Sequence, residues 1–269
     1  LVNSKISRFE TKTIIENFLT EHISWNWRSP CLYLENNKKD LIYFSGSVSD
    51  CFYNKKEIDY YINTHEQNLG HCATGYARAS GKPGICIVTS GPGLTNMVTP
   101  MLDAQNDGCP LLVLSGQVPL SAMGTQAFQE APSIEITKPF TKWSYCVKDI
   151  NELEDVMEES YNIMLNGRPG VVHIDLPKCI LNTEVDKKFL ETVTIQYNSS
   201  HIEINNKSDY NNEITELVNM INRSKKPVLY IGQGCNNAST ILRKLAKKNN
   251  IPVTTTIHGL GIFDETDDL

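Results

Sequence analysis

The chain has 269 residues, a formal net charge of −6 and an apolar content of 40%. At roughly 150 residues per domain, this length fits one large domain or two ordinary ones. The negative charge argues against a broad basic surface for nucleic acid, and the sequence has no run of about 18 apolar residues that would cross a bilayer. We therefore expect neither nucleic acid nor a membrane among its partners.

Eight cysteines are scattered singly along the chain, without a CxxC pair or a cluster of cysteine and histidine. Most lie in apolar runs, which favours buried, reduced thiols over a disulfide framework or a zinc site. The sequence thus predicts a soluble, intracellular protein and offers no candidate metal ligands.

Strands and helices alternate in the apolar pattern of the first two thirds of the chain. Apolar runs bounded by glycine or proline indicate buried parallel strands. Such strands are expected at residues 41–44, 60–63, 85–90, 110–115 and 171–176. Helical patterns lie between them, at residues 65–80, after Gly93 and from Asn151 to Gly167. This alternation predicts an α/β fold with a doubly wound parallel sheet.

Three helix ends carry specific expectations. Gly81 is expected to end the helix at 65–80 in a left-handed conformation. Thr95 or Asn96 is expected to cap the helix after Gly93, and Asn151 the helix that ends at Gly167.

The composition changes after residue 184. Residues 185–211 are polar, rich in Asn and Ser and without periodicity, so we expect them to link two domains. A second α/β unit follows at residues 212–269, with Gly-Gln-Gly at 232–234 between a strand and a helix. It holds barely two βα turns, which cannot complete a core. We therefore expect a complete domain at 1–184, a linker, and an incomplete second domain.

Glu66 follows a predicted strand and opens a helix. A carboxylate in the first helical turn is stabilised by the helix dipole, which is one interpretation. The other is a carboxyl group in a ligand cleft, because α/β sheets bind ligands at the carboxyl ends of their strands. There it would share a proton with a ligand nitrogen.

Three further segments offer polar groups. The segment at residues 90–96 (SGPGLTN) is either a tight turn or a ligand-binding loop, and it lacks the spacing of the dinucleotide and P-loop motifs. In the loop at residues 124–130 (GTQAFQE), Phe128 and Gln129 either contact a small substrate or anchor the loop. Lys142 and Lys148 either meet an anionic substrate or are solvated.

Together these segments resemble a known family. The motifs are HEQNLGHCATGYARASGKPG, VTSGPGLTNMVTPMLDAQNDGCPLLVLSGQVP, GTQAFQEA, TKW and GRPGVVHIDLPK. Their order and spacing resemble the N-terminal, pyrimidine-binding domain of thiamine diphosphate enzymes, and AFQEA and TKW are similar to the catalytic subunit of acetolactate synthase of the fungal type. KKPVLYIGQG and IPVTTTIHGLGIFDE resemble the start of that family's central, FAD-binding domain.

The resemblance implies thiamine diphosphate as cofactor, together with Mg²⁺ and FAD, whose ligands lie mostly outside this chain. Glu66 matches the glutamate that bonds the aminopyrimidine of the cofactor, and Gln129 is the second catalytic candidate. The cofactor-binding candidates are Glu66, Pro92, Asn96, Gly46, Lys138, Gly232, Gly234, Asn237, Thr256 and Ile257. Phe128, Gln129 and Lys148 match residues of the substrate channel.

The implied activity is decarboxylation of pyruvate and condensation with a second 2-keto acid, in the biosynthesis of the branched-chain amino acids valine and isoleucine. The resemblance also implies a transferase that works as a homodimer, with a regulatory subunit as a possible partner. It places the protein in the mitochondrion or plastid of a eukaryote, and otherwise in the cytoplasm.

Two departures from the family pattern leave alternatives open. Ser45-Gly46-Ser47-Val48 stands where the family has Pro-Gly-Gly-Ala, and Ser47 adds bulk at a close approach. The Gly-Asp-Gly…Asn segment that binds diphosphate and Mg²⁺ is not among the 269 residues. We expect the N-terminal part of an acetolactate synthase that is inactive alone. The alternatives are a truncated, non-catalytic remnant or another 2-keto-acid enzyme such as a pyruvate oxidase, whereas Glu66 disfavours glyoxylate carboligase.

Overall fold

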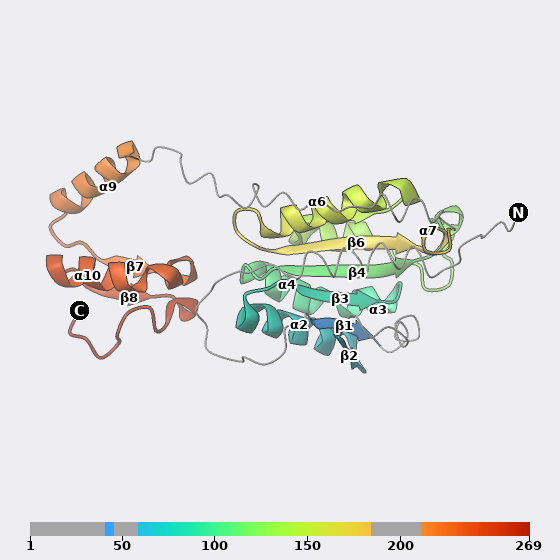
Figure 1. Ribbon diagram of the computed structural model, residues 1–269, viewed down its shortest axis with the longest axis horizontal. Coiled ribbons are helices and arrows are strands. Elements are labelled where there is room, and N and C mark those ends of the chain that lie inside the picture. The colour runs from blue at the N-terminus through green and yellow to red at the C-terminus, as the bar shows by residue number, and fades with distance from the viewer. Residues whose placement is uncertain (1–40, 46–58, 184–210) are drawn as a thin grey trace, which may run out of the picture. The chain divides into compact units, whose positions relative to one another are not determined.

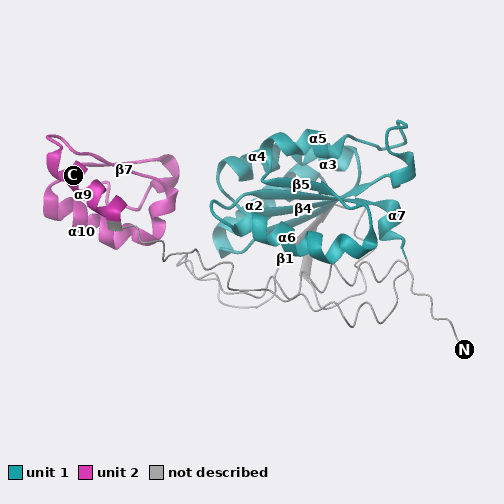
Figure 2. Ribbon diagram, turned by 90° about the horizontal axis from the view of Figure 1, so that it is seen from above, with its two compact units in different colours: residues 1–204 teal, residues 205–269 magenta. Residues whose placement is uncertain are grey.

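The computed structural model describes residues 41–45, 59–183 and 211–269 (Figure 1). The chain divides into two compact units, unit 1 at residues 1–204 and unit 2 at residues 205–269 (Figure 2). Gly46 and nearly all of the predicted linker lie outside the described residues.

A six-stranded parallel sheet forms the centre of unit 1 (Figure 1). Its strands are β1 (Leu41–Ser45), β2 (Asp59–Asn63), β3 (Gly84–Val88), β4 (Leu111–Gln117), β5 (Trp143–Cys146) and β6 (Val171–Pro177). They lie in the order β2-β1-β3-β4-β6-β5, and every neighbouring pair is parallel. This arrangement confirms the α/β fold that the alternating apolar pattern predicted.

Helices cover both faces of the sheet. The helices α2 (Glu66–Ser80) and α4 (Val98–Asn106) pack on one face, and α6 (Leu153–Leu165) packs on the other (Figure 2). Because side chains alternate along a strand, Ile85 and Ile87 of β3 join the core under α6, while Cys86 and Val88 join the core under α2 and α4. Burial on both faces explains why these strands are continuous apolar runs.

Two predicted helix caps are wrong and one helix end is confirmed. Gly81 ends α2 with a φ of 72°, the left-handed conformation expected there. The helix α3 (Pro92–Asn96) begins at Pro92, a residue suited to the first helical position, so Thr95 and Asn96 lie inside it and do not cap it.

The cap before α6 is Asp149 and not Asn151. The Asp149 side chain accepts from the backbone N–H of Asn151, and Glu152 bonds back to the Asp149 backbone. This reciprocal capping box begins a 3₁₀ turn, η4 (Ile150–Glu152), that leads into α6.

Several short elements of unit 1 are absent from the sequence prediction. They are η2 (Leu120–Ala122), α5 (Ser133–Thr137), η3 (Lys138–Phe140), the strand β5 and α7 (Lys178–Leu181). All except α7 lie between β4 and α6, where the apolar signal is weak.

Unit 2 contains two parallel strands with helices. Its elements are α9 (Asn211–Arg223), β7 (Leu229–Ile231), η6 (Gln233–Ala238), α10 (Ser239–Asn249), β8 (Val253–Thr255) and η7 (Ile257–Gly259). Apolar side chains of α9 are largely exposed, with 56% for Leu217 and 63% for Met220.

The prediction of buried thiols holds for half of the described cysteines. Cys86, Cys109 and Cys146 are buried, Cys235 is half-buried, and Cys72 and Cys179 are exposed; all six are free thiols. Within the described segments, no helix combines the length and apolar character needed to cross a membrane.

Candidate functional site

The sequence-predicted residues of unit 1 gather where the strands of its sheet end. All neighbouring strands are parallel, so their carboxyl ends share one edge. Glu66 follows β2, the Gly91-Pro92 turn follows β3, and the loop with Phe128 and Gln129 follows β4. This edge is where α/β sheets generally bind ligands.

Glu66 is held in place by a residue from the next βα unit. It is the first residue of α2 and is half-buried. The Asn96 side-chain amide donates to Glu66 Oε2 at 3.0 Å. Among the described residues, Oε1 has no hydrogen-bond partner. One carboxylate oxygen is therefore fixed by protein and the other can meet a ligand.

The Gly-Pro-Gly turn packs directly on the backbone of the loop after β4. Gly91 has a φ of 57°, which L side chains rarely adopt, and a Cβ there would lie 2.4 Å from the carbonyl oxygen of Gln129. Only glycine permits this approach. The structure thus brings Gln129 beside Pro92, although 36 positions in the sequence, from Gly93 to Gln129, separate the two motifs.

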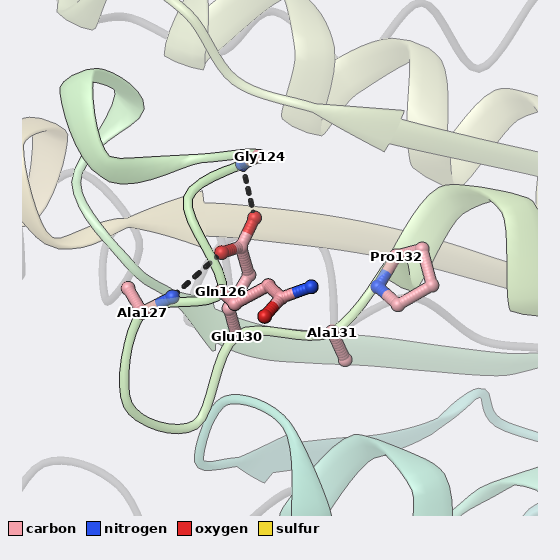
Figure 3. Close-up of a pocket in the computed structure, with 6 residues that line it drawn as sticks. All are labelled: Gly124, Gln126, Ala127, Glu130, Ala131 and Pro132. Carbon is pink, nitrogen blue, oxygen red and sulfur yellow. Dashed lines mark hydrogen bonds between the residues drawn. The ribbon is translucent and has the colours of Figure 1, made fainter.

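The side-chain carboxylate of Glu130 fixes the conformation of the loop after β4 (Figure 3). Glu130 accepts hydrogen bonds from the backbone N–H groups of Gly124 and of Ala127, the latter at 2.9 Å. These bonds lower the pKa of Glu130 because they favour its charged form. Gln126 and Gln129 have positive φ values of 60° and 61°.

A pocket of about 330 Å³ opens beside this loop. It is lined by Gly124, Gln126, Ala127, Glu130, Ala131 and Pro132 (Figure 3). Phe128, in the same loop, is 89% exposed, and Gln129 is exposed as well. Phe128 therefore does not anchor the loop to the core, which favours the alternative of contact with a ligand.

The three lysine candidates lie in different places. Lys148 follows β5 and is exposed, and its backbone N–H donates to Glu152. Lys138 is exposed at the junction of α5 and η3. Lys142 binds the carbonyl oxygens of Asn166 at 2.6 Å and Arg168 at 3.0 Å, and partial burial lowers its pKa. These two bonds connect Lys142 to the turn before β6.

The candidates of unit 2 follow its two strands. Gly232 comes after β7 and Thr256 after β8, and a Cβ at Gly232 would lie 3.6 Å from Thr256 Oγ1. Gly234 has open space around it, Asn237 is exposed, and Ile257 is 78% exposed. Gly232, Thr256 and Ile257 therefore lie together at the carboxyl ends of β7 and β8.

Sequence reasoning missed a buried polar network under α5. Ser115 Oγ lies 2.7 Å from His173 Nε2 and donates to Asp175 Oδ1 at 2.5 Å. Thr137 Oγ1 lies 2.9 Å from His173 Nδ1. Gln117 donates to Asp175 Oδ2 at 2.8 Å. The available signal was three polar residues, Ser115, His173 and Asp175, inside apolar strands.

Burial shifts the pKa values of the two titratable groups in opposite directions. Desolvation raises the pKa of Asp175 to about 6, although hydrogen bonds from Ser115 and Gln117 oppose the shift. Desolvation lowers the pKa of His173 to about 3, so its imidazole is neutral. Throughout the described part of the chain, no group of three or more His, Cys, Asp or Glu could hold a metal ion.

Two family models match the chain. The N-terminal TPP binding domain of thiamine pyrophosphate enzymes matches residues 45–136, and the central domain of these enzymes matches residues 214–269. The first match contains Glu66, Asn96 and Gln129.

Curated relatives agree with these matches. The mitochondrial acetolactate synthase catalytic subunit of Aspergillus candidus is 44% identical over 82% of this chain and 33% of the relative. That of Saccharomyces cerevisiae is 44% identical over the same shares. The chloroplastic acetolactate synthase of Arabidopsis thaliana is 41% identical over 76% of this chain and 30% of the relative.

The chain thus spans about a third of the length of these relatives. The matches confirm the resemblance inferred from the motifs. Since its matched segments are the N-terminal and central domains of one enzyme family in their usual order, the chain belongs to the thiamine pyrophosphate enzymes.

Proposed function

We propose that this chain is the pyrimidine-binding part, with the start of the central domain, of an acetolactate synthase. The hydrogen bond from Asn96 to Glu66, at the strand edge that Gln129 also occupies, carries the proposal. Such an enzyme decarboxylates pyruvate and joins the remaining two-carbon unit to a second 2-keto acid, a transferase reaction of valine and isoleucine biosynthesis. The domain limits we propose are 1–184, a linker at 185–211, and 212–269.

The carboxylate of Glu66 fits the aminopyrimidine of thiamine diphosphate. Asn96 occupies Oε2 and prevents free rotation, so Oε1 is left to hold or share a proton with a ring nitrogen. When bound, the cofactor supplies a nucleophilic carbon and an electron sink for the keto acid.

The residues around Glu66 have complementary roles in this proposal. Pro92, together with Asn96, borders the pyrimidine. Gln129 is positioned beside Pro92 to donate or accept a hydrogen bond at the keto acid, and exposed Phe128 offers it an apolar surface. Lys148 places a positive charge at the entrance, where it attracts the carboxylate of a 2-keto acid.

Unit 2 offers groups that suit FAD, whereas the described residues offer no site for Mg²⁺. Glycines and short side chains follow both strands of unit 2, so we propose Gly232, Gly234, Asn237, Thr256 and Ile257 as its contacts to FAD. Lys138 is a further proposed FAD contact. The described residues do not fit Mg²⁺, because they form no cluster of three or more ligands.

The names of the fungal relatives describe catalytic subunits of a mitochondrial enzyme, and the name of the Arabidopsis relative describes a chloroplastic enzyme. On that basis we propose a regulatory subunit as partner and a mitochondrial or plastid location. The family resemblance supports a homodimer as the catalytic unit and 2-keto acids as substrates.

Calorimetric titration of the 269-residue chain with thiamine diphosphate tests the role of Glu66. Glu66→Gln should weaken binding about tenfold or more, because it removes a charged hydrogen-bond partner. Glu159→Gln removes the same charge from an exposed position of α6 and should bind like the wild type. Equal affinity of the wild type and Glu66→Gln contradicts the proposal, as does a wild-type chain that binds no cofactor at millimolar concentration.

Product formation from pyruvate tests the activity itself. With thiamine diphosphate, Mg²⁺ and FAD, the isolated chain should form no acetolactate, because its described residues offer no metal site for the diphosphate. Detection of acetolactate would contradict the proposal that the groups binding Mg²⁺ and diphosphate lie outside this chain. In the full-length gene product, Glu66→Gln should lower turnover by about 10²–10⁴-fold, and unchanged turnover would remove Glu66 from the mechanism.

A further inference from the structure

We propose that Gln117 is a positioning residue that closes the neck of the loop at residues 118–131 and thereby fixes Phe128 and Gln129. The neck is the pair of chain segments at Val118 and Ala131, where the loop leaves the sheet and returns to it. Only the consequence for substrate rests on the proposed function, since the loop geometry stands without it.

The Gln117 side chain bonds both ends of the loop. Gln117 is the last residue of β4 and is 4% exposed. Its Oε1 accepts from the backbone N–H of Val118 at 2.8 Å, and its Nε2 donates to the carbonyl oxygen of Ala131 at 3.1 Å. One amide group therefore satisfies backbone atoms at the start and at the end of the same loop.

The surroundings fix the orientation of this amide. Nε2 also donates to Asp175 Oδ2 at 2.8 Å, and Ser133 Oγ lies 2.8 Å from it, so its two N–H groups are shared among Asp175, Ser133 and Ala131. Since a carboxylate only accepts, the nitrogen must face Asp175 and the oxygen must face Val118. Exchange of the two ends would set an oxygen against a carboxylate and an N–H against an N–H.

Asp175 connects the neck to the buried centre of the sheet. It is 0% exposed on β6, opposite Ser115 of β4, from which it accepts a hydrogen bond. Hydrogen bonds to a buried charged group are the strong ones in proteins. The loop is thus connected to two central strands of the sheet through Gln117 and Asp175.

The neck and the tip of the loop are held separately. Glu130 binds the backbone at Gly124 and Ala127 and so fixes the shape of the tip. The Gln117 amide fixes where that tip lies relative to the sheet, and the tip carries Gln129 against Gly91. If the Gln117 contacts are lost, the tip should keep its internal hydrogen bonds to Glu130, while its position relative to the sheet is no longer fixed.

Hydrogen–deuterium exchange of the 269-residue chain tests the neck without cofactor or substrate. Gln117→Met keeps the side-chain length but removes every hydrogen bond. It should raise exchange of the backbone amides at 122–130 about tenfold or more, because a local opening then costs less free energy. Amides of β3 and β6 should keep their protection, which shows that the variant has folded.

Gln105→Met is the matched control. Gln105 also uses its side-chain oxygen to accept from a strand backbone, the N–H of Val171 at 2.8 Å, but Val171 is the first residue of β6 and lies far from this loop in the sequence. The same substitution there should leave exchange at 122–130 unchanged. Equal exchange of this loop in the wild type and Gln117→Met, or equal acceleration by both substitutions, overturns the proposal.

A charge-balanced double variant keeps the test valid if Gln117→Met fails to fold. Gln117→Glu with Asp175→Asn restores an amide–carboxylate pair between the two positions. It removes the Gln117 N–H from the carbonyl of Ala131, which then keeps only the donors of Ser133. Exchange should then rise at 127–131 and stay slow in β4 and β6. Wild-type protection at 127–131 would show that the Ala131 bond does not hold the loop and would overturn the proposal.

The kinetic consequence is tested in the full-length enzyme. Gln117→Met should raise KM for pyruvate about tenfold while the affinity for thiamine diphosphate stays unchanged, because the loop carries substrate contacts and Glu66 does not depend on it. If exchange at 122–130 rises but KM stays unchanged, Gln117 holds the loop as proposed, and the loop's role in substrate binding is refuted. A loss of cofactor affinity of the same size would contradict a positioning role.

Discussion

The two units of this chain bury their apolar residues to very different degrees. In unit 1, β4 and β6 are buried along nearly their whole length and a separate core lies on each face of the sheet. In unit 2, β7 and β8 are mostly half-exposed. The helix α9 exposes Ile214, Leu217 and Met220, although its sequence has the periodicity of a helix with one apolar face.

The difference shows what an apolar pattern does and does not determine. An amphipathic sequence sets which face of a helix is apolar. Whether that face is buried depends on a second layer against which it packs. The patterns of α6 and α9 are alike in kind, yet only α6 lies on a sheet wide enough to cover it.

The largest expected contrast is in the contribution of leucines to stability. Leu112→Ala empties a fully buried position of β4 and should lower the free energy of unfolding of unit 1 by about 2–5 kcal/mol. Leu217→Ala, at an exposed site of α9, should change stability by less than about 0.5 kcal/mol. Urea unfolding followed by Trp143 fluorescence, in a Trp25→Phe/Trp27→Phe background, measures the first effect. Equal losses of unfolding free energy from the two substitutions would contradict the expected difference between the two units.

The second contrast is in the response to pH, because only unit 1 has a buried titratable pair among the described residues. Between pH 4 and 6, native Asp175 keeps a proton that the unfolded chain has lost, and native His173 lacks one that the unfolded chain holds. These contributions to proton binding offset each other. Asp175→Asn leaves the His173 contribution alone, so the unfolded state binds one more proton than the native state.

The unfolding free energy of Asp175→Asn should therefore rise with pH by about 1.4 kcal/mol per unit more steeply than that of the wild type in this window. Urea unfolding at pH 4.5, 5.0 and 5.5 measures both slopes. Parallel slopes would mean that Asp175 is ionised in the native protein throughout the window.

The smallest expected contrast is between two glycines. Gly91→Ala places a methyl group against the Gln129 carbonyl at a positive φ and should cost about 1–3 kcal/mol. Gly234→Ala meets no atom within 4 Å in unit 2 and should be nearly neutral. Thermal unfolding of both variants compares them, and a neutral Gly91→Ala would show that the turn and the loop can separate.

Elements with strong local signals could be predicted from the sequence. The apolar runs of β3, β4 and β6 and the end of α2 at Gly81 lie within two residues of their predicted limits. The strand β5 was missed because it has the sequence Trp-Ser-Tyr-Cys and is half-buried, so it lacks a continuous apolar run.

Contacts between distant residues could not be predicted in this way. Asn96 was expected as a cap, yet its amide binds Glu66, 30 residues away along the chain. Gln117 lies beyond the predicted strand at 110–115 and carries no signal of its own in the sequence; the fold places Ala131 and Asp175 beside it. Resemblance supplied the candidates of the site, while the geometry supplies the bonds that hold them.

The strand order has a consequence for how unit 1 folds during synthesis. β5 precedes β6 in the sequence but lies at the edge of the sheet, and among the described strands it pairs with β6 alone. The ribosome therefore releases β5 before the strand on which it docks exists. Until residue 177 has emerged, the stacked pair Trp143 and Tyr145 has no sheet beneath it. A nascent chain that stops short of β6 thus carries an exposed aromatic strand, a target for chaperones and a source of aggregation.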